Sequence, residues 1–193
     1  MDEKQVAQLR VAIERFGDTA APDAKQAAAS VLAFIERCSS PSRRSTREGH
    51  LTASGWVVDR TFTHALLILH RKLNRWLQPG GHIEDADVSW RAAAQREVTE
   101  ETGLTAFIAQ LADAEIFDMD VHPIPERHDE PAHIHYDIRY LFVADVDATV
   151  DREHILNADE AHDCRWIPLA GLALDPAIEP SLRRMVGLSM LRG

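Results

Sequence analysis

GGHIEDADVSWRAAAQREVTEETGL, residues 80–104, is the stretch that decides the fold. It opens with a glycine pair and continues into an expected helix whose last part carries Glu97, Glu100 and Glu101. At roughly 100° per residue, glutamates spaced at i, i+3 and i+4 fall within an arc of about 100°. The spacing therefore predicts three carboxylates on one face of this helix.

The apolar residues of the same helix indicate whether that face is solvated or buried. Those closest in direction to Glu97 are Trp90, Ala93 and Ala94. Those on the opposite side are polar: Gln95, Thr99 and Thr102. The helical period thus places the carboxylates on the inward stripe, although charged runs on helices are more often simply solvated.

Inward carboxylates need compensating positive charge to stay ionised. Arg96 stands four residues before Glu100 and can pair with it, but one guanidinium does not balance three carboxylates. A hard divalent cation completes the balance, and oxygen ligands without a cysteine or histidine cluster select Mg²⁺ or Mn²⁺. Because Mg²⁺ commonly binds carboxylates together with substrate phosphates, the pattern indicates phosphate chemistry.

The segment resembles the Nudix box. From Arg96 to Leu104 it matches every required position: Arg-Glu, an aliphatic residue, any residue, Glu-Glu, any residue, Gly and an aliphatic residue. The first half departs from the pattern, because Asp87 stands where the box has Glu, and eight residues, not seven, follow it before Arg96. We place the additional residue in the loop, since an insertion within the helix would rotate the glutamates away from the apolar stripe.

The resemblance implies a Mg²⁺-dependent hydrolase of a nucleoside diphosphate linked to another moiety, with Mn²⁺ as the alternative cation. Glu97 and Glu101 match the usual metal ligands, and Glu100 matches a third ligand or the general base. Arg96 matches the residue that orients a glutamate, and Gly81 matches a backbone carbonyl that joins the metal shell.

The implied fold is α/β, a Nudix-type α/β/α sandwich with a mixed β-sheet, preceded by an N-terminal helical pair. We expect residues 1–45 to form the helical extension and linker, with Asp23 capping the second helix, and residues 46–193 to form the Nudix hydrolase domain. Strand signals cover residues 51–59, 64–69, 104–111, 114–119, 135–146 and 165–168. The helical pair is interpreted as a brace for the domain, with a homodimer contact or a substrate lid as alternatives.

Further candidate residues flank the box on both sides. Arg71 and Lys72 precede the glycine turn and either contact phosphate or form solvated surface. Glu160 is the candidate general base outside the box, and Glu100 is its rival.

Histidines crowd a proline-rich loop, residues 119–135, and the strand after it: His122, His128, His133 and His135. We assign His133 and His135, which share one face of a strand, to substrate binding together with His82. A structural role is the alternative, and a transition-metal site is disfavoured because no cysteine or helical His-x₃-His spacing accompanies them.

Composition narrows the function classes. The 193 residues carry a net charge of −10, which disfavours a nucleic-acid polymer as substrate and leaves a small nucleotide or diphosphate as partner. No apolar run approaches the length of a membrane span and the acidic start is no signal peptide, so a cytoplasmic location is expected. Cys38 and Cys164 are expected to be reduced thiols.

Two other functions compete with the hydrolase. An isomerase of the isopentenyl diphosphate type needs a cysteine upstream of the box, and none lies between Cys38 and Gly80. A non-catalytic nucleotide or metabolite sensor is disfavoured because the three box glutamates are retained.

Overall fold

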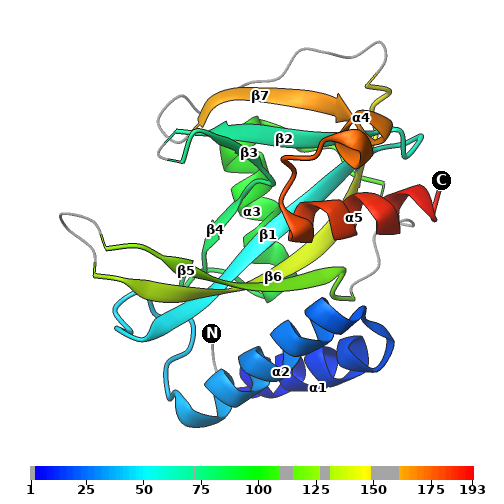
Figure 1. The fold of residues 1–193 in the computed structure, drawn as a ribbon. Helices are drawn as coiled ribbons and strands as arrows, with labels where there is room; N and C mark the ends of the chain where they lie inside the picture. The colour runs from blue at the N-terminus through cyan, green and yellow to red at the C-terminus, as the bar shows by residue number, and fades with distance from the viewer. Residues whose placement is uncertain (1–2, 72, 109–114, 127–130, 149–160) are drawn as a thin grey trace. The chain divides into compact units, whose positions relative to one another are not determined.

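The structure is a computed structural model that describes residues 3–71, 73–108, 115–126, 131–148 and 161–193 (Figure 1). The chain divides into two compact units. Unit 1 comprises Met1–Ser54, Gly81–Ala94 and Ala114–Tyr140, and unit 2 comprises Gly55–Gly80, Gln95–Asp113 and Leu141–Gly193. No helix among the described residues is long and apolar enough to cross a membrane.

Helices and strands alternate in a mixed α/β order. The helices are α1 (Glu3–Thr19), α2 (Pro22–Arg37), α3 (Trp90–Thr102), α4 (Leu169–Leu174) and α5 (Pro180–Met190). The strands are β1 (Gly49–Asp59), β2 (His64–His70), β3 (Arg75–Leu77), β4 (Gly80–His82), β5 (Asp118–Ile124), β6 (His133–Ala144) and β7 (Ala161–Pro168). They form one sheet in the order β3-β2-β1-β6-β5, with β4 paired to β1 and β7 paired to β2.

In unit 1 the predicted N-terminal helical pair is present, and α1 and α2 lie side by side next to β5 and β6 (Figure 1). Phe34 of α2 is fully buried, and its ring stacks on that of Tyr136 of β6 with centroids 4.2 Å apart. Arg37 pairs with Glu48 and donates to the Tyr136 hydroxyl. These contacts support the interpretation of the pair as a brace, while the homodimer contact stays a prediction.

The start of α2 differs from the expectation. Its N-cap residue is Ala21, which makes no side-chain capping hydrogen bond, and Pro22 occupies the first turn. Asp23 therefore lies inside the helix and is not its cap. Proline explains the shift, because its fixed φ suits a first helical position and its missing N–H costs nothing there.

The β5–β6 hairpin begins later than expected. Its register runs from Asp118↔Arg139 to Ile124↔His133, so half of the segment expected to be a loop is strand. Pro123 is tolerated because β5 is the last strand in the described sheet, where one ladder donor is dispensable. The strand expected over residues 104–111 is wrong for its described part, which holds only an isolated bridge between Phe107 and Ala144.

In unit 2 the second half of β1 is covered closely by α3. A Cβ atom on Gly55 would lie 2.3 Å from Cγ2 of Val98 and 3.1 Å from the Phe142 ring. The missing side chain at Gly55 thus lets the helix rest directly on the strand. Val98 stands two residues after Arg96 and next to Glu97 in the sequence. The contact between Val98 and Gly55 therefore sets the position of the part of α3 that carries the acidic residues.

Candidate active site

The acidic residues of α3 differ in their burial. Glu97 is 8% exposed and Glu101 is 3% exposed, which confirms that these two face inward. The side chain of Glu100 is 51% exposed, so the expectation that all three carboxylates face inward is wrong for Glu100. Thr102, expected on the solvent side, is 1% exposed.

The packing of Val98 explains both differences. Because Val98 fills the space at Gly55, the buried arc of α3 is centred between Val98 and Glu101 instead of on Glu97. At roughly 100° per residue this arc takes in Thr102, four residues after Val98, and leaves Glu100 about 130° from its centre. Glu100 therefore lies at the edge of the site.

Each glutamate of the box has a defined hydrogen-bond partner. Nη1 of Arg96 donates to Oε1 of Glu97 and to Oε2 of Glu100, both at 2.9 Å. The backbone N–H of Gly80 donates to Oε2 of Glu101 at 2.8 Å. The glycine turn is thus bonded directly to α3, and Arg96 holds two carboxylates as the resemblance implies.

This donor set suits a hard divalent cation. Two nearly buried carboxylates share one face, and the guanidinium that contacts Glu97 is shared with the exposed Glu100. Carboxylate oxygens at low exposure are favourable ligands for Mg²⁺ or Mn²⁺ and unfavourable without added positive charge. Glu97 and Glu101 are therefore the residues that could hold the metal.

The β7 strand contributes Cys164 and Arg165 to this part of unit 2. Burial, with further contributions from Asp163 and Glu101, raises the pKa of the Cys164 thiol to about 12. Cys164 is therefore an unreactive thiol near the acidic site. Cζ of Arg165 lies 5.4 Å from the centroid of the Trp76 ring, a cation–π contact.

The loop before α3, to which we assign the additional residue, is ordered by local hydrogen bonds. The helix is continuous from Trp90, and Oγ of Ser89 caps it by accepting the N–H of Ala92 at 3.1 Å. Asp87, at the Glu position of the box, accepts the N–H of Glu84 at 2.8 Å. Asp87 thus closes a turn in this loop.

Several predicted residues keep their roles as predictions only. Gly81 follows Gly80 in β4, and its carbonyl role stays untested. Arg71 is exposed in the turn after β2. Lys72, Glu160 and His128 lie outside the described residues.

The histidines of unit 1 gather around a member that the sequence analysis missed, His50 of β1. Its ring centroid lies 4.9 Å from that of His82, 4.9 Å from that of His133 and 4.8 Å from that of His135. One nitrogen from each of His50, His133 and His135 lies within 4.8 Å of the others. We call His50, His82, His133 and His135 the histidine cluster.

Local contacts set the chemical state of two cluster members. Nδ1 of His133 lies 2.8 Å from the carbonyl oxygen of Pro131, which can only accept, so Nδ1 carries a proton and the lone pair of the neutral ring is on Nε2. Burial, reinforced by His50, His122, His82 and His133, lowers the pKa of His135 to about 2. His135 is therefore neutral at physiological pH.

On the same face of β5 and β6, a buried ionic network lies next to the histidines. Register pairs put Asp118 opposite Arg139, Asp120 opposite Asp137 and His122 opposite His135. The Arg139 guanidinium contacts the three carboxylates at 2.9 Å (Asp137), 3.1 Å (Asp118) and 3.3 Å (Asp120). Burial alone would lower the pKa of Arg139, but these carboxylates outweigh it and raise the pKa.

A signal for this network is present in the sequence. Polar residues alternate along three segments: 50, 52 and 54; 118, 120 and 122; and 133, 135, 137 and 139. A period of two places such residues on one face of a strand, and here that face is buried and polar.

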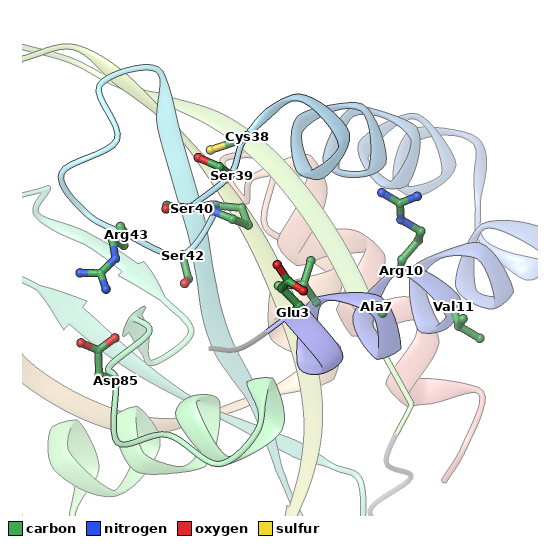
Figure 2. A pocket seen from close by; sticks show the side chains of 12 residues that line it. Glu3, Ala7, Arg10, Val11, Cys38, Ser39, Ser40, Ser42, Arg43 and Asp85 are labelled. Atoms are coloured by element: carbon green, nitrogen blue, oxygen red, sulfur yellow. The ribbon is translucent and has the colours of Figure 1, made fainter.

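A separate hollow of about 620 Å³ lies between α1 and the segment that joins α2 to β1 (Figure 2). Arg10, Arg43 and Asp85 are among its charged lining residues, and Cys38 also lines it. Among the predicted site residues that the structure describes, none lines this hollow.

The family of the chain follows from comparison with known proteins. A family model described as NUDIX domain matches residues 49–187. No curated protein sequence matches the chain.

Solved structures share the fold. A NUDIX-family hydrolase from Clostridium perfringens is 24% identical with a TM-score of 0.52, covering 77% of this chain and 99% of its own. An Ap4A hydrolase from C. elegans is 15% identical with a TM-score of 0.52, covering 74% of this chain and 96% of its own. The NUDIX domain of Shewanella oneidensis NrtR, complexed with ADP ribose, is 15% identical with a TM-score of 0.51, covering 83% and 96%.

These likenesses confirm the predicted α/β fold of Nudix type with its N-terminal helical pair. The family model spans most of the chain and includes the whole segment from Gly80 to Leu104. The chain therefore belongs to the Nudix family.

Proposed function

We propose that this protein is a Nudix hydrolase that cleaves a phosphoanhydride bond in a nucleoside diphosphate linked to another moiety. One observation carries the proposal: Glu97 and Glu101 are both nearly buried on one face of α3, fixed by Arg96 and by the Gly80 N–H. A buried carboxylate pair is costly unless a cation compensates it. Family membership supports the hydrolase assignment.

Glu97 and Glu101 would hold Mg²⁺, with Mn²⁺ as the alternative. A divalent cation bound there would neutralise the diphosphate and lower the pKa of a water molecule. Arg96 orients Glu97 and Glu100 through its two hydrogen bonds, and the Gly80 N–H fixes the oxygen of Glu101. The Glu100 side chain lies at the exposed edge of the site, where it can reach substrate or solvent. Glu100 and Glu160 are the two candidates for the general base.

The decisive variant is Glu101→Gln, which keeps the size of the side chain and removes its charge. We expect kcat/KM to fall about a thousandfold or more, equal to about 4 kcal/mol of transition-state stabilisation, with a higher Mg²⁺ requirement. Glu36→Gln is the matched control, because Glu36 is an exposed helical carboxylate 3.9 Å from Arg10. Unchanged turnover in Glu101→Gln would contradict the metal assignment.

The substrate is best identified with a panel assayed in Mg²⁺ and in Mn²⁺: ADP-ribose, NADH, dinucleoside polyphosphates, CoA and (d)NTPs. Two structural neighbours are an Ap4A hydrolase and a domain complexed with ADP ribose. Dinucleoside polyphosphates and ADP-ribose are therefore the first compounds to assay. We expect Arg71 and Lys72 to contact the diphosphate, so Arg71→Ala should raise KM more than it lowers kcat.

The alternative is a non-catalytic sensor of a nucleotide or metabolite. It predicts that no compound of the panel is cleaved, whereas one of them raises the melting temperature. Loss of that stabilisation in Glu101→Gln would locate the ligand at the box.

A further inference from the structure

We propose that His50, His133 and His135 form a binding site for a transition-metal cation of the zinc class, chemically distinct from the carboxylate site of α3. The three ligands come from β1 and β6 of unit 1, and His82 of β4 lies beside them. Imidazole nitrogens suit Zn²⁺, Co²⁺, Ni²⁺ and Cu²⁺, whereas Mg²⁺ prefers oxygen.

The spacing of the nitrogens is close to what such a cation needs. The three candidate ligand atoms lie within 4.8 Å of one another. Tetrahedral ligands at about 2.0–2.1 Å from zinc are separated from each other by about 3.3 Å. The ligands would thus move together by at most about 1.5 Å, a distance that rotation of the side chains about χ1 and χ2 covers.

The hydrogen bonding of His133 and the burial of His135 support metal binding over simple packing. The Pro131 carbonyl fixes a proton of His133 on Nδ1, so Nε2 is the nitrogen through which the neutral ring would coordinate a metal. Nε2 of His135 is buried and has no hydrogen-bond partner among the residues that the structure describes. A buried imidazole nitrogen without a hydrogen-bond partner is unfavourable unless a water molecule or a cation contacts it.

Residues behind the cluster resemble the outer shell of a metal site. Nδ1 of His122 lies 3.0 Å from Oδ2 of Asp120, and its ring centroid lies 5.6 Å from that of His135. A carboxylate–imidazole pair thus lies next to His135, outside the three proposed ligands.

The charge of the same sheet face also fits a divalent cation. Three carboxylates, Asp118, Asp120 and Asp137, contact the single guanidinium of Arg139. Formally, this leaves two negative charges next to a cluster of imidazoles. A bound divalent cation would balance them.

Cobalt titration tests the proposal without relying on hydrolase activity. Protein stripped of metal with EDTA is equilibrated in excess Mg²⁺, which saturates oxygen ligands, and Co²⁺ is then added while visible d–d absorption is followed. We expect one Co²⁺ per chain with the intense absorption of a tetrahedral site, displaced by Zn²⁺. A wild-type protein that binds no Co²⁺ under these conditions overturns the proposal.

Variants then locate the cation. His135→Gln and His50→Gln should weaken Co²⁺ binding on the order of 100-fold or more. Loss of an outer-shell partner alone lowers metal affinity about 10–100-fold, and loss of a ligand should lower it further. His64→Gln, a change on β2 beside Asp59, should bind Co²⁺ as the wild type does. Glu101→Gln should also bind normally. Retained affinity in His135→Gln, or lost affinity in Glu101→Gln alone, refutes the assignment.

Folding and substrate effects can be separated. Far-UV circular dichroism and the melting temperature of each metal-free variant are compared with those of the wild type. If His50→Gln does not fold, the Co²⁺ affinity of His135→Gln decides the question, because His135 is the least buried of the three ligands. Should ADP-ribose stabilise metal-free wild type but not His135→Gln while Co²⁺ fails to bind, the cluster is a substrate contact and the metal proposal is wrong.

Discussion

One methyl group added at Gly55 tests whether the contact between β1 and α3 positions the active site. The new Cβ atom of Gly55→Ala would lie 2.3 Å from Cγ2 of Val98 and 3.1 and 3.2 Å from two Phe142 ring carbons. Carbon atoms pack at about 3.5–4.0 Å, so α3 or β1 must shift by more than about 1 Å. Val98 lies between Glu97 and Glu101, so both carboxylates would move with it.

The expected magnitude follows from this shift. Overpacking of a buried site costs about 1–3 kcal/mol of the free energy of unfolding, and each kcal/mol lowers the melting temperature of a chain of this size by about 2–4 °C. A displacement of about 1 Å can lower turnover by about 100-fold. Thermal unfolding and kcat/KM for the substrate identified by the panel measure both effects.

A double-mutant cycle with Val98→Ala supplies the control. Val98→Ala alone removes two buried methyl groups and should destabilise the protein by about 1–3 kcal/mol. In that background Gly55→Ala should cost at least about 1 kcal/mol less than in the wild type, because the main clash is gone. Additive effects within about 0.5 kcal/mol, or an unchanged melting temperature in Gly55→Ala, would refute the reasoning.

Two further predictions concern buried charges. Arg139→Met leaves buried carboxylates without their guanidinium and should lower the free energy of unfolding in urea by about 3–5 kcal/mol. The control Arg60→Met, at an exposed pair 3.9 Å from Asp145, should cost less than about 1 kcal/mol, and equal losses would contradict the role of burial. For Asp59, burial alone would raise the pKa, but hydrogen bonds from Thr61, His64 and Thr63 outweigh it and lower the pKa. The stabilisation by Asp59 is therefore complete above its unfolded pKa of about 3.9 and is lost as the pH falls through the lower folded value. The difference in unfolding free energy between wild type and Asp59→Asn should shrink from pH 7 to pH 3, and a constant difference would contradict this.

The helix of the box was predictable in type and position because its signal is local. Glycine, capping serine and the helical period all lie within residues 80–104, and Glu97 and Glu101 are buried as the period indicates. The exposure of Glu100 was not predictable, because it depends on Val98 resting against Gly55, far away in sequence. The contact with β1 thus places Val98 inside the buried arc of α3 and leaves Glu100 at its edge.

The histidine cluster shows a second limit of sequence reasoning. The shared face of His133 and His135 followed from strand alternation, and the structure confirms it with ring centroids 4.9 Å apart. The membership of His50 in the cluster could not be predicted, because its proximity to His133 depends on the order of the strands in the sheet. No local pattern in a single sequence encodes that order. The same applies to Arg139, whose three carboxylate partners come from β5 and β6.

Pro123 in β5 has a consequence for association between molecules. An edge strand presents free N–H and C=O groups that can template β-pairing with another chain, and proline removes one donor from such an edge. In the described part of the chain β5 ends the sheet order. Extension of the sheet from one molecule to the next is thereby discouraged at this edge, so two copies that met along β5 would associate through side chains more readily than through backbone pairing.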